Sequence, residues 1–365
     1  MEVETPVTDP VTTGIAEAKP PSFGSSSAGW TLLFALAIWL LAFFFYRAAP
    51  YLRSGSDVIF SAKLRWERKG DVFPAGRGKT RLLIFGDSKI LAGFMPREFD
   101  RLAAAAGEPV ESFNSGFPGM DYFLPPLKTL CRRGQAPDVV LMTLVWRGDP
   151  PKRDIFHFIS DDHAMIQDLF PFRNLPRDLT AYLMNAPAHG GLLNSYRDAR
   201  EAASRMVADR GYYLIREQSH FPLGRLPDDF HLASDTPARV ILRQAPVPSA
   251  QLRSFNQVLR QYHIRCFYVP RYMRQGEVAP PPAFNRAFAE ALERNSSCRL
   301  LGPEYYLYPN RDFSDQTHAN AEGARLYTRA LFDLVKPELR SSAAAGARQS
   351  GAGAASGKGS EDALQ

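Results

Sequence analysis

The strongest constraint on the fold of this chain is an alternation of short apolar runs with segments of helical pattern. The runs that predict strands are Thr80–Phe85, Pro109–Asn114, Asp138–Trp146, Ile264–Val269 and Arg299–Gly302. The segments that predict helices are Pro96–Gly107, Asp121–Arg133, Ser254–Tyr262, Pro282–Asn295 and Asn320–Leu334. Strands that alternate with helices favour a parallel sheet covered by helices on both faces. We therefore expect a three-layer α/β/α domain over residues 80–340.

The alternation lapses between residues 150 and 253, where the chain is rich in Arg, Tyr and Pro and contains only helical pieces. A chain of 365 residues can bury one large core, or one core with an inserted subdomain. We interpret this stretch as an insertion or lid. Its aromatic residues either bind a ligand or fill the core of the insertion itself, and those singled out are Trp146, Tyr182, Tyr196, Tyr212 and Tyr213.

The amino-terminal part contains an uncharged apolar run, Trp30–Tyr46, which is nearly long enough as a helix to cross a bilayer. We predict a transmembrane anchor over 30–49, preceded by a disordered segment over 1–29 and followed by a linker over 50–79. A cleaved signal peptide is the alternative, but the leader is acidic and the apolar core is long. The tail over 341–365 has low complexity and is expected to be disordered.

Charge and cysteine content exclude several classes of protein. The net charge of +6 comes from scattered arginines, and no nucleic-acid-binding motif is recognisable, so no nucleic-acid partner is expected. The three cysteines, Cys131, Cys266 and Cys298, lack metal-ligand spacing, so the sequence predicts no zinc site and no disulfide framework. Cys266 lies in an apolar run and is expected to be a core residue. No metal or cofactor is expected.

A polar turn, Gly86-Asp87-Ser88, follows the first strand and begins a helix. The carboxyl ends of parallel strands are where ligands bind in such sheets, so Ser88 is a candidate nucleophile. The alternative is that Asp87 and Ser88 only cap the helix. A second motif, Asp315-x-x-His318, precedes the last helix. A serine nucleophile needs a base to accept its proton, and the imidazole needs a carboxylate to fix its tautomer.

Together these two motifs resemble the SGNH/GDSL hydrolase family, over about Thr80–Val335 with the middle unmatched. The resemblance implies a flavodoxin-like sheet, with Ser88, Asp315 and His318 as the catalytic residues. It also implies oxyanion donors at the N–H groups of Ser88 and Gly116, the latter within Phe113–Gly119. The family's third block usually contains an asparagine, whereas the third strand here ends in Leu-Val-Trp-Arg147-Gly148. Arg147 either replaces that donor or serves as a structural ion-pair partner.

The resemblance further implies a membrane-anchored serine esterase or O-acyltransferase that acts on acyl groups, O-acetyl above all, of a polysaccharide. It predicts a single-pass protein of the bacterial inner membrane with a periplasmic domain, and a membrane acyltransferase or glycan synthase as its partner. The positive-inside rule opposes this orientation, because Arg47, Arg53, Lys63 and Arg65 follow the anchor and only Lys19 lies near it on the other side. The alternatives are a non-catalytic subunit of a polysaccharide assembly complex and a lipid esterase.

Overall fold

A five-stranded parallel sheet forms the centre of the molecule. The structure is a computed structural model and describes residues 25–48, 51–52, 56–69, 72–73, 78–117, 123–143, 175–214, 221–244 and 246–355. The strand order is β2-β1-β3-β4-β6, and every neighbouring pair is parallel. The strands are β1 (Thr80–Gly86), β2 (Val110–Gly116), β3 (Val139–Met142), β4 (Arg265–Tyr268) and β6 (Cys298–Leu300).

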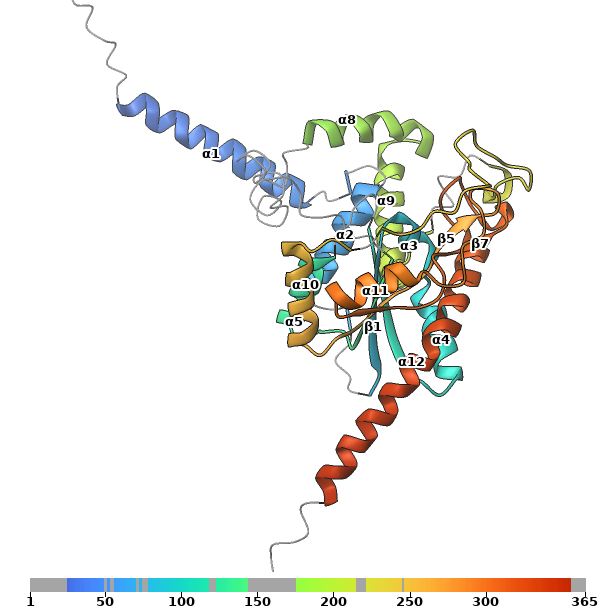
Figure 1. Ribbon diagram of the computed structural model, residues 1–365. Coiled ribbons are helices and arrows are strands. Elements are labelled where there is room, and N and C mark those ends of the chain that lie inside the picture. Colours follow the sequence, from blue (N-terminus) through green and yellow to red (C-terminus); the bar gives the residue numbers. More distant parts are fainter. Residues whose placement is uncertain are drawn as a thin grey trace, which may run out of the picture.

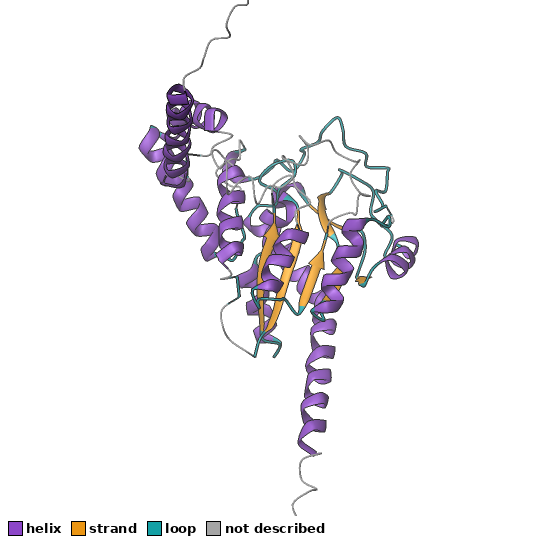
Figure 2. Cartoon of the chain, turned by 90° about the vertical axis from the view of Figure 1, so that its left-hand side faces the viewer, coloured by secondary structure: helices purple, strands orange, loops and turns teal. Residues whose placement is uncertain are grey.

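Helices cover both faces of this sheet (Figures 1 and 2). Successive strand residues point to opposite faces, so Leu83 and Phe85 of β1 belong to one hydrophobic cluster and Leu82 and Ile84 to another. The first cluster is completed by α5 (Leu124–Arg132), α10 (Ala250–Gln261) and α11 (Arg286–Asn295). The second is completed by α3 (Ser88–Gly93), α4 (Pro96–Ala105) and α12 (Ala321–Ala355). The α/β class and the parallel sheet predicted from the sequence are confirmed.

A second sheet, which the sequence analysis missed, lies beside the first. It pairs β5 (Arg271–Arg274) with β7 (Tyr305–Tyr308) in parallel. β5 begins three residues after β4 ends, so the chain leaves the carboxyl edge of the main sheet and almost at once forms this second pairing. The small sheet therefore lies at the edge of the main sheet where a ligand site is expected.

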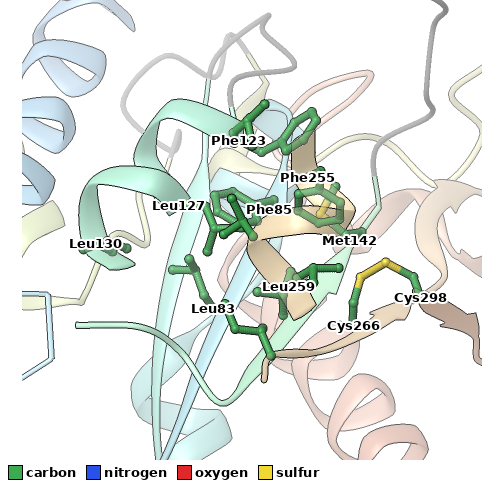
Figure 3. Close-up of a cluster of buried hydrophobic side chains, with 14 of the residues drawn as sticks. Leu83, Phe85, Phe123, Leu127, Leu130, Met142, Phe255, Leu259, Cys266 and Cys298 are labelled. Carbon is green, nitrogen blue, oxygen red and sulfur yellow. A yellow bond between two sulfur atoms is a disulfide. The ribbon is translucent and has the colours of Figure 1, made fainter. Parts of the chain in front are cut away.

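The cysteines overturn one prediction. Cys266 and Cys298 form a disulfide across neighbouring positions of β4 and β6, although the sequence had predicted no disulfide and a plain core role for Cys266. Both residues are buried in the first hydrophobic cluster (Figure 3). The sequence did not reveal the pair because the two strands are distant along the chain and meet only through the sheet register. Cys131 is a buried free thiol.

Helix α1 (Ser25–Ala48) contains residues 30–48 of the anchor predicted over 30–49, and it projects away from the domain in Figure 1. Residue 49 lies outside the described residues. Its segment Ala28–Phe45 has a mean hydropathy of 2.2, is not buried by the rest of the chain, and is long enough to span a membrane. Residues 25–29, expected to be disordered, already belong to this helix, and residues 1–24 lie outside the described residues.

The segment predicted as a linker over 50–79 contains a folded element, helix α2 (Ser56–Lys69). Its residues Val58, Ile59 and Ala62 pack with Leu91 of α3 and with α9 (Leu192–Ala208). The insertion predicted over 150–253 contains α9, α8 (Leu175–Asn185) and the start of α10, and its residues 151–174 are not described. α9 therefore joins helix α2 to the sheet domain.

The last helix extends beyond the predicted end at Leu334. α12 runs to Ala355, so the disorder expected from residue 341 is replaced by helix over 341–355. Alanine is the best helix former, and the tail sequence from Ser341 is rich in it, which favours continuation of the helix. Residues 356–365 lie outside the described residues.

Candidate active site

The turn that carries Ser88 follows β1 directly. Asp87 is the N-cap of α3, and its carboxylate accepts a hydrogen bond of 2.9 Å from the Lys89 N–H. The capping interpretation is therefore correct for Asp87. Ser88 is the first residue of α3 and is half-buried at the carboxyl end of the strand.

Two glycines allow the ends of β1 and β2 to approach the Ser88 turn closely. Gly86 and Gly116 face each other in the register of the two strands. A Cβ at Gly86 would lie 2.2 Å from the Ile90 side chain, and one at Gly116 would lie 2.5 Å from the backbone nitrogen of Leu91. Both contacts are too short for any larger residue. These glycines are therefore required by packing, whatever else they do.

Asp315 and His318 lie together on a tight loop before α12. The Asp315 carboxylate lies 2.8 Å from His318 Nδ1 and also accepts the backbone N–H groups of Thr317 and His318. The pKa of Asp315 is lowered, because these hydrogen bonds and the imidazole outweigh the opposing effect of burial. His318 Nε2 is buried and has no partner among the described residues. The imidazole is thus held by one nitrogen and leaves the other free for a proton transfer.

Tyr272 of β5 connects this loop to the Ser88 turn. Its buried hydroxyl donates to the carbonyl oxygen of Lys89, at 2.9 Å, and accepts the N–H of Ala319, at 3.1 Å. Lys89 directly follows Ser88, and Ala319 directly follows His318. One oxygen atom therefore joins backbone groups of the two residues that directly follow the proposed nucleophile and the proposed base. Gly93 makes room for this ring, because a Cβ there would lie 2.3 Å from it.

Arg274 supports the same loop from the same face of β5. Its buried guanidinium donates to the carbonyl oxygen of Gln316, at 3.0 Å, and to the Asp235 carboxylate, at 2.8 Å. Tyr272 and Arg274 are two residues apart, so their side chains leave the strand on one side. β5 therefore fixes the Asp315–His318 loop at two points.

The electrostatic surroundings of Ser88 are mixed. Burial lowers the pKa of Lys89, and Arg271 and Arg274 lower it further, whereas Glu277 and Asp87 act in the opposite direction. The Lys89 ammonium also lies 6.0 Å from the centre of the Tyr272 ring. A positive group next to Ser88 favours negative charge that develops close to it.

The structure gives less support to the three proposed oxyanion donors than to the contact between Asp315 and His318. The N–H of Gly116 donates to Asn114 Oδ1, at 2.9 Å, so it is already used in this conformation. Arg147 and Gly148 lie outside the described residues. The Ser88 N–H stands at the start of α3. The roles of Ser88, Gly116 and Arg147 in an oxyanion hole stay predictions.

A cavity of about 470 Å³ lies at the amino end of α12, next to the Asp315–His318 loop. Its lining includes Arg225, Arg311, Asp312 and Glu322, together with three leucines. Asp312 lines this cavity, whereas the carboxylate that contacts His318 is that of Asp315. Asn320 caps α12 by accepting the N–H of Gly323.

The aromatic residues of the insertion are mostly packed into the protein. Tyr182 and Tyr212 are buried, and Tyr213 packs on the cluster formed by α2, α3 and α9. Tyr196 contacts the ring of Tyr51, with centroids 5.4 Å apart. Trp146 lies outside the described residues. The packing interpretation therefore fits the buried members of this group.

Tyr272 and Arg274 are the site residues that the sequence analysis did not find. Their strand is four residues long and, among the described strands, pairs with β7 outside the main sheet. Its residues, Arg-Tyr-Met-Arg, do not form the continuous apolar run by which the main strands were predicted. The signal available was a polar, aromatic segment immediately after a predicted strand of the sheet. Comparisons with known proteins add nothing to this picture, since no family model, no curated protein and no solved structure matches the chain.

Proposed function

We propose that this protein is a membrane-anchored serine esterase or O-acyltransferase of the SGNH/GDSL type, acting on acyl groups of a polysaccharide. One observation carries the proposal: Asp315 holds His318 by Nδ1, while the Tyr272 hydroxyl joins the N–H of Ala319, which follows His318, to the carbonyl oxygen of Lys89, which follows Ser88. Base and carboxylate are thus hydrogen-bonded, and the segments of Ser88 and His318 are held to one hydroxyl. His318 Nε2 has no partner among the described residues, so the Ser88 hydroxyl does not donate to it in this conformation, and acyl transfer requires that contact to form when substrate binds.

The chemistry follows from the roles of these groups. His318 Nε2 accepts the proton of the Ser88 hydroxyl as Oγ attacks the ester carbonyl, and Asp315 stabilises the imidazolium that forms. The tetrahedral intermediate collapses to an acyl-serine, and His318 returns the proton to the departing alcohol. A water molecule or a sugar hydroxyl then attacks the acyl-serine, with His318 again as the base. Water gives hydrolysis, and a sugar hydroxyl gives acyl transfer.

The proposed test is covalent labelling of the full-length protein with a fluorophosphonate, which modifies activated serines. We expect labelling at Ser88, loss of labelling in Ser88→Ala, and labelling slower by about 10²–10⁴ in His318→Ala. Removing Ser88 and His318 together should cost little more activity toward an ester than removing Ser88 alone. Ser204→Ala and His189→Ala are matched controls, because both residues are exposed and lie in the insertion.

A non-catalytic assembly subunit is the second candidate, and it is favoured by the use of the Gly116 N–H inside the protein. An oxyanion donor already bonded to Asn114 is not free, and the loss of one donor costs about 2.7–4 kcal/mol of transition-state stabilisation. Folded wild-type protein that is not labelled at Ser88 would favour this candidate over the enzyme.

We also propose that the domain lies outside the cytoplasm. The disulfide between Cys266 and Cys298 supports this location, because disulfides persist in oxidising compartments and are rare in the cytosol. This argument is independent of the family resemblance.

A further inference from the structure

Two charged residues of the juxtamembrane helix α2 are buried, and the chemistry proposed above does not use them. Lys63 is 0% exposed and Glu67 is 2% exposed. They lie four residues apart, on one face of the helix. Burying two ionisable groups is costly, and a buried pair often contributes less stability than apolar residues of similar size. Such a pair calls for an explanation other than stability.

Both residues bind the carboxyl end of β2. Lys63 Nζ donates to the carbonyl oxygen of Gly116, at 2.7 Å, and lies 5.4 Å from the centre of the Phe117 ring. Glu67 Oε1 accepts the hydroxyl of Ser115, at 2.7 Å. Two side chains of α2 thus contact three consecutive residues at the end of one strand.

That strand end packs directly against the Ser88 turn. The peptide between Gly116 and Phe117 is held at both ends, by Lys63 at its carbonyl and by the carbonyl oxygen of Gly86, which accepts the Phe117 N–H at 3.0 Å. A Cβ at Gly116 would lie 3.0 Å from the carbonyl oxygen of Asp87. A shift of this peptide would therefore move the backbone on either side of the turn that carries Ser88.

The surroundings of the pair disfavour the charged form of both side chains. Burial lowers the pKa of Lys63, against the attraction of Glu67. Burial raises the pKa of Glu67, against its hydrogen bond from Ser115 and the attraction of Lys63. The second carboxylate oxygen of Glu67 is buried and has no partner among the described residues. Burial disfavours the charged form of each group. The pair therefore differs from a surface ion pair whose charges stabilise the fold.

We infer that Lys63 and Glu67 are positioning residues that hold the Gly116 end of β2 against the Ser88 turn, so that the juxtamembrane helix completes the active site. The inference rests on the proposed function, because it assigns the pair a role in the chemistry of Ser88. It also means that the membrane anchor is connected to the site through one helix.

The test replaces both charges by neutral groups of similar shape, in Lys63→Met/Glu67→Gln. Met keeps the length of the lysine stem, and Gln keeps an acceptor for Ser115. We expect fluorophosphonate labelling of Ser88 to slow by at least about tenfold, while the unfolding temperature stays equal or rises. With p-nitrophenyl acetate as the probe substrate, the loss should fall on kcat and leave KM unchanged, since the pair does not touch the substrate.

Two further variants separate positioning from stability. Ile59→Ala weakens the packing of the same helix and keeps the charged pair, so below its melting temperature it should be labelled at the wild-type rate. Lys69→Met removes an exposed charge from the same helix and should change neither measurement. Equal slowing in Ile59→Ala and the double variant would overturn the inference, as would an unchanged rate in the double variant. Wild-type protein that is folded and not labelled would overturn the proposed function and this inference together.

Discussion

Tyr272 is a single residue on which the geometry of the candidate site depends. Its side chain is fully buried, and burial raises the pKa of its hydroxyl well above the usual value, so the group is a neutral donor and acceptor at any ordinary pH. The hydroxyl donates to the Lys89 carbonyl oxygen, in the segment of Ser88, and accepts the Ala319 N–H, in the segment of His318. No charged side chain would satisfy the Lys89 carbonyl and the Ala319 N–H at the same time with this geometry.

The variant Tyr272→Phe keeps the ring and removes the hydroxyl. It leaves two buried backbone groups unpaired, and we expect the free energy of unfolding to fall by about 1–3 kcal/mol for each group left unsatisfied. Labelling of Ser88 by a fluorophosphonate should also slow, because the two segments are no longer joined. The measurements are denaturant unfolding and the second-order rate constant of labelling.

Tyr327→Phe is the matched control for this prediction. The two rings pack together, with centroids 5.0 Å apart, and the Tyr327 hydroxyl donates to the carbonyl oxygen of Pro270. Its removal should cost stability and leave the labelling rate unchanged below the melting temperature. A slowing of labelling that matched in the two variants would contradict the positioning role of Tyr272.

At the scale of single residues, the sequence predicted contacts between residues that are close along the chain, and it did not predict contacts between residues that are far apart along it. Asp315 and His318 are three residues apart, so their contact follows from a tight loop and was predictable from spacing. Tyr272 and Lys63 act on segments far away in the chain, at positions fixed by the packing of several elements. No local pattern encodes such contacts, and for that reason both residues were missed.

At the scale of elements, helix α2 was also not predicted from the sequence. The main strands were predicted because their apolar runs are continuous, whereas α2 contains five charged residues beyond Asp57 and looked like a solvated linker. Three of its apolar residues, Val58, Ile59 and Ala62, nevertheless pack on α9 and on Leu91. A charged helix can be buried where its charges find partners, as Lys63 and Glu67 do.

The variant Ile59→Ala tests whether α2 belongs to the folded domain. Ile59 is 1% exposed, and we expect its truncation to lower the free energy of unfolding by about 2–5 kcal/mol, measured on a fragment that begins at Tyr51. Leu193→Ala is the control, because Leu193 lies on the helix that packs against α2 and is 83% exposed. A flexible linker over 50–79 would instead predict no effect from either change.

At the scale of the whole molecule, two features bear on the location proposed for the domain, and they point in opposite directions. The positive charges after the apolar helix favour the cytoplasm, but one of them, Lys63, is buried and donates to the Gly116 carbonyl oxygen, with Glu67 one helical turn away. The disulfide between β4 and β6 favours an oxidising compartment. The long apolar helix and the sheet were both predictable from composition and pattern, but the disulfide depends on the register of two strands that the sequence does not specify.

Two experiments, thiol alkylation and reporter fusion, together determine the orientation of the domain. With the domain outside the cytoplasm, protein isolated from cells, denatured without reductant and alkylated should carry one modified thiol, that of Cys131, and three after reduction. A reporter that is active only outside the cytoplasm, fused after Arg340, should be active, and a cytoplasm-specific reporter at the same position should be silent. Three modified thiols without reductant, together with activity of the cytoplasmic reporter alone, would place the domain in the cytoplasm. The acyl groups of an exported polysaccharide would then be out of its reach.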